Sequence, residues 1–320
     1  MKIVKQDAKV LIPESPMKHI EKIGRICYKS EDKIADGSDR KFIRSLYKNK
    51  HHAMLEHFRF IMEVDENTFY QLALAKPRHF EFTSPNQSMV VTDRYLISCN
   101  ARALMDLRTY NRCRRCSHLQ ASIVNTIIDD IIGHIVNRYG CHELFGIDRD
   151  TYSHMFSTNI TFIDNNRKCM TEDEWIYHGW MTVDMVTDRG ISHEIVRHRE
   201  ETSFAQESTR YCNYGNDKFG KEITVIDQGF NGSAYVSWAS AMQKCEDKYF
   251  ELLDEGQTPQ MARSVLPTCL KTEIVMTAPM YEWNHFFDLR MKGTTGKPHP
   301  MIEDLSKMIY KQYKEVVFNA

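Results

Sequence analysis

Cationic, hydroxyl and amide side chains are concentrated in one stretch of the chain, residues 197–211. The stretch reads Arg-His-Arg-Glu-Glu-Thr-Ser-Phe-Ala-Gln-Glu-Ser-Thr-Arg-Tyr and contains a single short apolar pair. Alternate residues of an extended segment point to the same side, so Gln206, Ser208 and Arg210 would face one way. An amide, a hydroxyl and a guanidinium on one side can hold a planar base and a phosphate together. The composition therefore predicts a local anion site.

The residues before this stretch indicate how it is positioned. Residues 188–190, Asp-Arg-Gly, are typical of a turn, and Ile191 and Ile195 after it fall on one face of a short helix. We expect the triplet Arg197-His198-Arg199 in the last turn of that helix, where cations also complement the negative end of the helix dipole. Stabilisation of the helix end is therefore an alternative explanation for the triplet alone. The continuation to Arg210 favours ligand binding.

The same stretch resembles the signature of the flavin-dependent thymidylate synthases, in which Arg-His-Arg is followed by a seven-residue spacer and then by Ser-x-Arg-Tyr. Here the spacer between Arg199 and Ser208 has eight residues, and the additional one lies within residues 200–203. Other segments that resemble the family are residues 24–30, 55–60, 258–267 and 282–290.

The resemblance implies a role for each polar residue of the site. Arg197, His198 and Arg199 would bind the flavin phosphate and polarise the flavin ring, with His51 and His285 also at the cofactor. The residues that would hold the nucleotide dUMP are Gln206, Ser208, Thr209, Arg210, Arg263 and Arg290. Arg290 and Ser208 would be catalytic, with Arg290 stabilising the negative charge that builds on the uracil during hydride attack.

The activity implied by the resemblance is reductive methylation of dUMP to dTMP. Methylenetetrahydrofolate would supply the carbon, FAD would carry the hydride and NADPH would reduce the flavin. Family members build shared active sites in a homotetramer, so the same assembly is expected here. Two alternatives stay open: methyl or hydroxymethyl transfer to another pyrimidine nucleotide by a flavin- and folate-dependent enzyme, and a catalytically inactive nucleotide-binding homologue.

Two departures from the family pattern bear on these alternatives. The family usually has Asn and Arg, both in contact with the flavin, where this chain has Pro279 and Tyr281. The family's closing motif His-Pro-Gln-Met-Arg-Glu is shortened to His-Pro-Met-Ile-Glu at residues 299–303. Flavin affinity and the details of hydride transfer are therefore expected to differ.

Composition excludes several other classes of protein. The 42 basic and 43 acidic residues give a net charge of −1, which predicts no surface for polymeric nucleic acid. No apolar run is long enough to span a membrane, and the first residues lack the apolar core of a signal peptide. Nine scattered cysteines favour a reducing cytoplasm. Cys113 and Cys116 have the spacing of a metal-binding pair, but without a second pair we expect ordinary thiols and no metal.

The order of predicted strands and helices, without regular βαβ repeats, indicates an α+β fold: a twisted, mostly antiparallel sheet flanked by helices. We expect one domain over residues 1–320, with an insertion at about 66–175 between two strands. Strands are expected over residues 2–12, 58–64, 176–186, 222–226 and 270–278, and helices from 16, 39, 119, 233, 259 and 300. On the helix over 233–253, Tyr235 and Tyr249 are expected on the buried face, and His57 is expected to be a core histidine.

Overall fold

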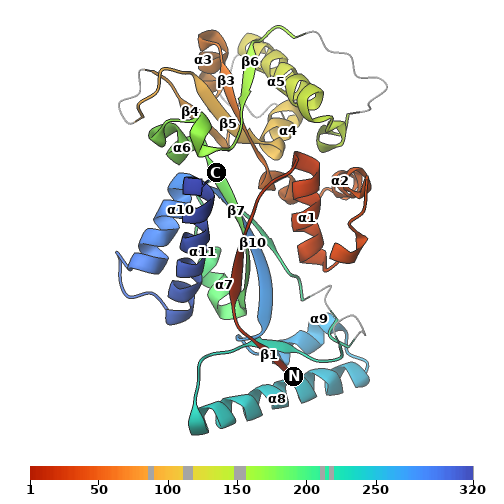
Figure 1. The fold of residues 1–320 in the computed structure, drawn as a ribbon. Helices are drawn as coiled ribbons and strands as arrows, with labels where there is room; N and C mark the ends of the chain where they lie inside the picture. The colour runs from red at the N-terminus through yellow and green to blue at the C-terminus, as the bar shows by residue number, and fades with distance from the viewer. Residues whose placement is uncertain (86–89, 111–117, 148–155, 210–212, 216–219, 320) are drawn as a thin grey trace.

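The strands of this chain lie in three tiers (Figure 1). A computed structural model of the chain describes residues 1–85, 90–110, 118–147, 156–209, 213–215 and 220–319. The middle tier is an antiparallel sheet of four strands in the order β2-β7-β10-β8. Their bounds are β2 Asp7–Leu11, β7 Trp180–Asp188, β10 Lys271–Pro279 and β8 Ser203–Gln206. β7 and β10 are the longest strands of this sheet, and a helix follows the end of each.

The upper tier is a second antiparallel sheet, in the order β4-β5-β3-β6. Its strands are β3 Arg59–Val64, β4 Phe80–Thr83, β5 Leu96–Asn100 and β6 Ile160–Ile163. Its helices are α3 Glu66–Ala75, α4 Ala101–Tyr110, α5 His118–Tyr139 and α6 Glu172–His178. The helix expected from residue 119 is α5, and its Ile127, Ile131 and Ile135, four residues apart, are buried on one face.

The remaining helices cover the middle sheet or form the lower tier (Figure 1). Those of the middle tier are α1 Pro16–Tyr28, α2 Ser38–Lys48, α7 Arg189–Ile195, α10 Met280–Phe287 and α11 Pro300–Asn319. The lower tier pairs β1 Lys2–Val4 with β9 Thr224–Ile226 in parallel, beside α8 Gly232–Asp254 and α9 Pro259–Ala262. Of the described helices, none combines the length and the apolar composition that a bilayer span needs.

The predicted α+β class with mostly antiparallel strands is confirmed, and the strands are divided among three sheets. Residues 66–175 supply β4, β5 and β6, which pair around β3. The treatment of this segment as an insertion into a single domain stays a prediction.

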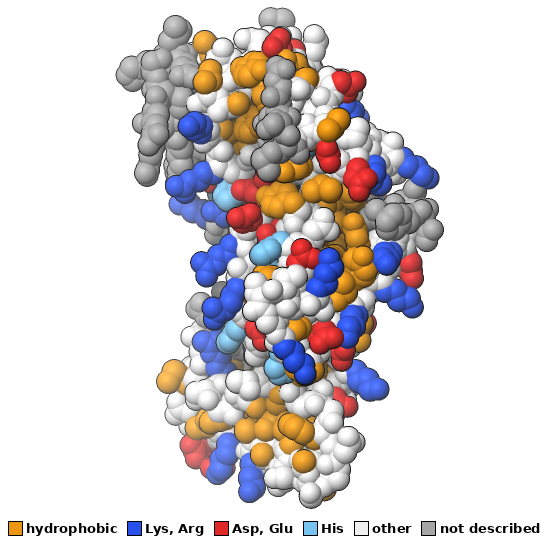
Figure 2. Space-filling view, turned by 90° about the vertical axis from the view of Figure 1, so that its left-hand side faces the viewer, with side chains coloured by type: hydrophobic (Ala, Val, Ile, Leu, Met, Phe, Trp, Pro, Cys, Tyr) orange, Lys and Arg blue, Asp and Glu red, His pale blue; other side chains and the backbone are white. Residues whose placement is uncertain are grey.

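One side of α8 is more exposed than its sequence predicted. Tyr249 is buried, but Tyr235 is 39% exposed because only a small cluster of side chains packs under this helix. Phe230, Val236 and Met261 are exposed in the same tier, and Figure 2 shows hydrophobic side chains on the surface of the lower end. An apolar surface of this kind is typical of a contact with another protein chain.

Asp184 on β7 provides a test of electrostatics in the middle sheet. Burial, together with the Glu273 carboxylate, raises the pKa of Asp184 from 3.8 to about 7. The folded chain therefore holds this proton more tightly than the unfolded chain, so the contribution to stability is full below about pH 4 and is lost as the pH rises through about 7. Asp184→Asn should raise the free energy of unfolding by about 1–3 kcal/mol at pH 8 and leave it unchanged near pH 4. Urea unfolding at the two pH values measures this, and an equal gain at both would contradict it.

Candidate functional site

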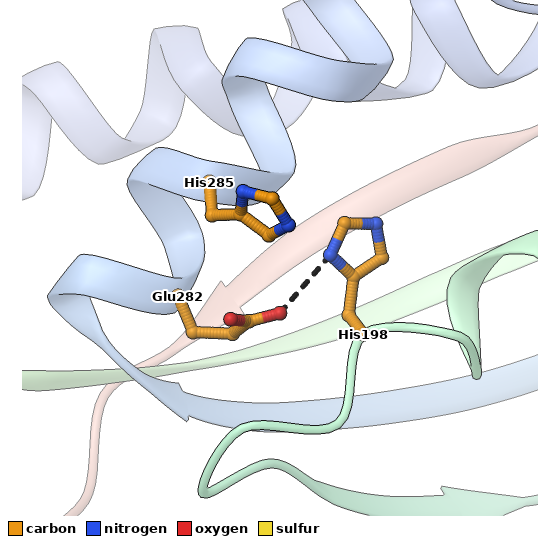
Figure 3. A group of neighbouring side chains, drawn as sticks. All are labelled: His198, Glu282 and His285. Carbon is orange, nitrogen blue, oxygen red and sulfur yellow. Dashed lines mark hydrogen bonds and ion pairs between the residues drawn. The ribbon is translucent and has the colours of Figure 1, made fainter. Parts of the chain in front are cut away.

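Two segments that leave the middle sheet bring the centre of the site together. β7 continues into α7 and the loop that carries His198, while β10 continues into α10, which carries Glu282 and His285. His198 Nδ1 lies 3.1 Å from Glu282 Oε1, and both residues are 3% exposed. Figure 3 shows the ring of His285 directed toward that of His198, and the ring centres are 5.6 Å apart. The imidazole of His198 is thus held between a carboxylate and a second histidine.

The partners of His198 define which of its nitrogens carries the proton. Arg290 Nε lies 3.2 Å from His198 Nε2, and a guanidinium nitrogen can only donate. Nε2 must then accept, so the proton is on Nδ1 and is donated to Glu282. The arrangement is a directed chain of hydrogen bonds that runs from Arg290 through His198 to Glu282.

Arg290 is fixed by three acceptors. Besides His198, its Nη1 donates to Glu194 Oε2 at 2.8 Å and its Nη2 to the Glu194 carbonyl oxygen at 3.2 Å. Arg290 lies in the π-helical turn Asp288–Lys292, an irregularity that is frequent at functional sites. Described residues accept from three of the five guanidinium N–H groups, and the other two have no partner among those residues and can donate to a bound molecule. The residue predicted to lie against the uracil is therefore oriented in advance.

His198, Glu282 and His285 also have the composition of a metal site, with ligand atoms within 4.8 Å of one another. A cation at His198 Nδ1 would need the lone pair of that nitrogen and would move the proton to Nε2. There it would face the Nε–H of Arg290. The hydrogen bonds as they stand thus oppose a metal ion. The other candidate pair, Cys113 and Cys116, lies outside the described residues.

Glu282 can be tested as the residue that orients His198. Glu282→Ala leaves the buried Nδ1–H of His198 without an acceptor, which should lower the free energy of unfolding by about 1–3 kcal/mol. Glu282→Gln keeps an acceptor oxygen and should recover most of that stability. Thermal unfolding of both variants measures these changes. Equal losses of stability in the two variants would show that the hydrogen bond between Glu282 and His198 does not stabilise the fold.

The prediction that the Arg-His-Arg triplet lies in the last turn of a helix is wrong. α7 ends at Ile195, and the N–H groups of Arg197 and His198 donate to carbonyls three residues back, so the chain turns out of the helix before the triplet. Arg197 and Arg199 are exposed while His198 is buried between them. No ion pair is found for either arginine in the described part of the chain. Two outward guanidinium groups without acidic partners are suited to bind an anion.

The residues predicted to hold the nucleotide lie in two places. Gln206 is the last residue of β8, and its amide nitrogen donates to the hydroxyls of Ser192 and Thr272 at 2.9 and 3.1 Å. Thr209 Oγ1 accepts a hydrogen bond of 3.0 Å from Arg263, which is exposed at the end of α9.

Ser208 lies two residues after the end of β8 and directly before Thr209, and Arg210 lies outside the described residues. The structure thus joins Thr209 to Arg263 and Gln206 to the middle sheet. The nucleotide-binding role of all these residues stays a prediction.

The two histidines of residues 51–57 have different surroundings. His51 is exposed, and its Nδ1 lies 3.0 Å from the hydroxyl of Tyr28; among the described residues no hydrogen bond joins it to His198, Glu282 or His285. His57 is fully buried, with Nδ1 2.8 Å from Thr277 Oγ1, and burial lowers its pKa to about 4. The expectation of a core histidine at 57 is confirmed, and the role of His51 at the cofactor stays a prediction.

The additional residue of the spacer is accommodated in a turn at residues 200–201. Glu201 has φ = 48°, in the left-handed region, and the hydroxyl of Thr202 donates to the Glu200 carbonyl. The carboxylate of Glu201 lies 3.3 Å from His79 Nδ1 and 3.5 Å from Arg59 Nη1. The lengthened spacer is thus the part of the signature that contacts the upper tier.

Tyr281, one of the two departures from the family pattern, is also used by the upper tier. Its hydroxyl donates to Glu81 Oε1 on β4 at 2.9 Å. Burial raises the pKa of Glu81. Pro279 ends β10 and is buried, and α10 starts from it. Position 281 thus contacts the upper tier where the family pattern has an arginine for the flavin.

Sequence reasoning left three residues of this region without a role. Glu194 orients Arg290, Glu282 orients His198, and Glu201 reaches the upper tier. Only Glu282 carried a signal, because it lies in the family-like segment 282–290. Glu194 pairs with a residue 96 positions away, which no local pattern shows.

Comparison with known proteins gives a family match over most of the chain. The family model described as "Thymidylate synthase complementing protein" matches residues 9–94 and 158–317. The flavin-dependent thymidylate synthase of Geobacter sulfurreducens is 30% identical over 151 residues, which is 47% of this chain and 64% of that protein. That of Pyrococcus furiosus is 32% identical over 105 residues, 32% of this chain and 42% of that protein. The chain thus matches less than two thirds of the length of either relative.

Alignment with a solved structure covers nearly the whole chain, at low similarity. The UMP/dUMP methylase PolB from Streptomyces cacaoi, bound with 5-Br dUMP, aligns over 99% of this chain and 93% of that chain with a TM-score of 0.40 and 15% identity. The family assignment depends on the family model. Its two matched segments lie on either side of residues 95–157 and together cover more than half of the chain. The chain belongs to the thymidylate synthase complementing protein family, the family of the flavin-dependent thymidylate synthases.

Proposed function

We propose that this protein is an enzyme that converts dUMP to dTMP by flavin-dependent reductive methylation, with FAD as cofactor and methylenetetrahydrofolate and NADPH as co-substrates. The observation that carries the proposal is the fixed guanidinium of Arg290, which keeps two N–H groups for a ligand beside the family's signature loop. The curated relatives that the chain matches are flavin-dependent thymidylate synthases, which supports the same activity.

The residues of the loop fit the phosphate end of FAD. Arg197 and Arg199 are exposed and have no ion pair in the part of the chain that is described, so a diphosphate would meet two uncompensated charges. His198, fixed by Glu282, would lie against the cofactor, with His285 and His51 as further contacts. When bound, the reduced flavin would supply the hydride of the reductive methylation.

The chain's own groups would bind and polarise the nucleotide. Arg263, Thr209, Ser208 and Arg210 would hold its phosphate and sugar, and the remaining amide oxygen of Gln206 would face the base. The two N–H groups of Arg290 would donate to a uracil oxygen as negative charge grows on the ring. Because Glu194 and His198 already fix that side chain, little reorganisation is needed at the moment of reaction.

The assembly and the alternatives follow from the same features. We propose a homotetramer with shared sites, since the exposed apolar side chains of the lower tier would be covered by another copy. We place the protein in the cytoplasm and treat it as one domain with an insertion at 66–175.

Tyr281, bound to Glu81, is the feature that favours the alternatives of another pyrimidine substrate or of an inactive nucleotide-binding homologue.

Flavin binding separates the enzyme from the inactive homologue. We expect the protein to purify yellow, or to quench the fluorescence of added FAD at micromolar concentration, because the phosphate-binding triplet is intact. Arg199→Ala should weaken FAD binding by about tenfold or more through the loss of a charge-assisted contact. Lys168→Ala, another exposed cation, serves as the control. An unchanged flavin spectrum and fluorescence with the unmodified protein would contradict the enzymatic assignment.

A further inference from the structure

A cavity of about 470 Å³ opens in the upper tier, between α3, residues 76–79 and α4. Its apolar wall includes Leu74, Pro77 and Leu107, and Leu74 is 64% exposed. A volume of this size exceeds what an inorganic ion needs and suits part of an organic ligand. The apolar wall would cover a carbon chain or a ring.

The rim of the cavity carries more positive than negative charge. Arg102 pairs with Glu56 and lies 3.8 Å from Asp106, so its single positive charge is already paired and these three residues carry one negative charge in excess. Lys76 and Arg78 also line the cavity, and neither has an ion pair among the described residues. Two uncompensated cations on either side of one proline would attract a ligand with negative charge.

His79 adds a titratable group on the same rim. Its Nδ1 lies 3.3 Å from Glu201 Oε1, and the hydrogen bond to this carboxylate raises the pKa of His79. The same carboxylate lies 3.5 Å from Nη1 of Arg59, which is 3% exposed and whose Nε and Nη2 have no partner among the described residues. A buried guanidinium with unused N–H groups strengthens the positive potential of this region.

The backbone is strained at this place. Lys76, His79 and Glu201 have φ of 47°, 63° and 48°, in the left-handed region that non-glycine residues seldom adopt. Such conformations are unfavourable and cluster at active sites and ligand-binding sites. Here they direct the cations of the turn toward the cavity and Glu201 toward His79.

The cavity is also connected to the signature loop. Glu201 follows Arg199 by two residues and binds His79, while Ser203 Oγ donates to Glu56 Oε2 at 3.2 Å. His79 and Glu56 both line the cavity. A ligand that reaches from the signature loop into the upper tier would therefore enter this cavity.

We propose that this cavity binds the anionic tail of a co-substrate, with Lys76, Arg78 and His79 contacting its carboxylate or phosphate groups. The inference deepens the function proposed above and rests on it. Carboxylates of the glutamyl tail of a reduced folate and phosphates of a nicotinamide dinucleotide share the required chemistry, a flexible chain with two or more negative charges. The lengthened spacer and the upper tier would then act together to enlarge the site for that tail.

The test compares Arg78→Gln and Lys76→Gln with the control Arg108→Gln, which removes a cation on α4 that pairs with Asp129 outside the cavity. One set of assays varies methylenetetrahydrofolate carrying one or several glutamates. The other set varies NADPH at saturating folate. We expect KM for one of the two co-substrates to rise about tenfold in each cavity variant, with kcat and the Arg108→Gln values unchanged.

Each outcome either supports the proposed ligand of the cavity or overturns it. A rise confined to folates with several glutamates identifies the glutamyl tail, and a rise confined to NADPH identifies the dinucleotide phosphates. Unchanged KM for both co-substrates in active variants would overturn the proposal. If the unmodified protein forms no dTMP, the proposed function fails separately, and direct titration with triglutamyl folate and with NADPH still compares the variants. Equal affinities of variants and unmodified protein in those titrations would reject the cavity as a binding site.

Discussion

Arg290→Ala should lower the rate of dTMP formation by about a hundredfold to a thousandfold, or roughly 2.7–4 kcal/mol, the usual cost of removing a group that stabilises charge in the transition state. Arg290 is held by Glu194 and His198, and two of its N–H groups stay unused. Because its proposed contact strengthens as charge develops on the uracil, kcat should fall more than KM rises. Steady-state kinetics with dUMP as the varied substrate measures both.

The control for Arg290→Ala is Lys292→Ala in the same π-helical turn. Lys292 is 60% exposed on its side chain and pairs only with Asp288 at 2.7 Å in the described structure, so its loss should change activity little. Glu194→Gln should lie between the two, because the backbone carbonyl of residue 194 still accepts from Arg290. Equal rates for Arg290→Ala and the unmodified protein would remove Arg290 from the catalytic group.

Arg263→Ala should weaken dUMP binding by roughly tenfold to over a hundredfold, or about 1.5–3 kcal/mol, through the loss of a charge-assisted contact to the phosphate. Arg263 is exposed, and its guanidinium donates to Thr209 Oγ1 at 3.0 Å. This hydrogen bond orients the side chain while leaving it accessible to a ligand. FAD affinity should hardly change. Arg210→Ala is expected to act in the same way, from its position in the signature.

Isothermal titration with dUMP and with FAD measures these affinities. Lys248→Ala removes an exposed cation of α8 that pairs with Glu251, and it serves as the control for Arg263→Ala. Equal losses of dUMP and FAD affinity in the Arg263 variant would show that this residue supports the fold instead.

The parts of the fold that local chemistry determines could be predicted from the sequence. The start of α1 follows from Ser15, whose hydroxyl accepts from the Lys18 N–H, with Pro16 at the first helical position. α5 follows from isoleucines at four-residue spacing, of which only Ile123 at its start is exposed. These features depend on residues within one or two turns of each other, so a linear pattern contains them.

The contacts that complete the site could not be predicted in this way. Glu194 and Arg290 are separated by 96 positions, and Tyr281 and Glu81 by 200. Both pairs depend on the order of strands in the sheets, which no local pattern determines. The spacing of Ile191 and Ile195 predicts a helix that continues into the triplet, whereas the three-residue turn at Arg197 ends the helix at Ile195.

Product analysis by mass spectrometry tests the central claim most directly. The purified protein is incubated with dUMP, methylenetetrahydrofolate, NADPH and FAD, and in parallel with dCMP in place of dUMP or without FAD. The account predicts dTMP from dUMP, no methylated or hydroxymethylated product from dCMP, and no product without flavin. A protein that binds FAD and dUMP yet returns dUMP unchanged, or that modifies dCMP instead, would contradict it.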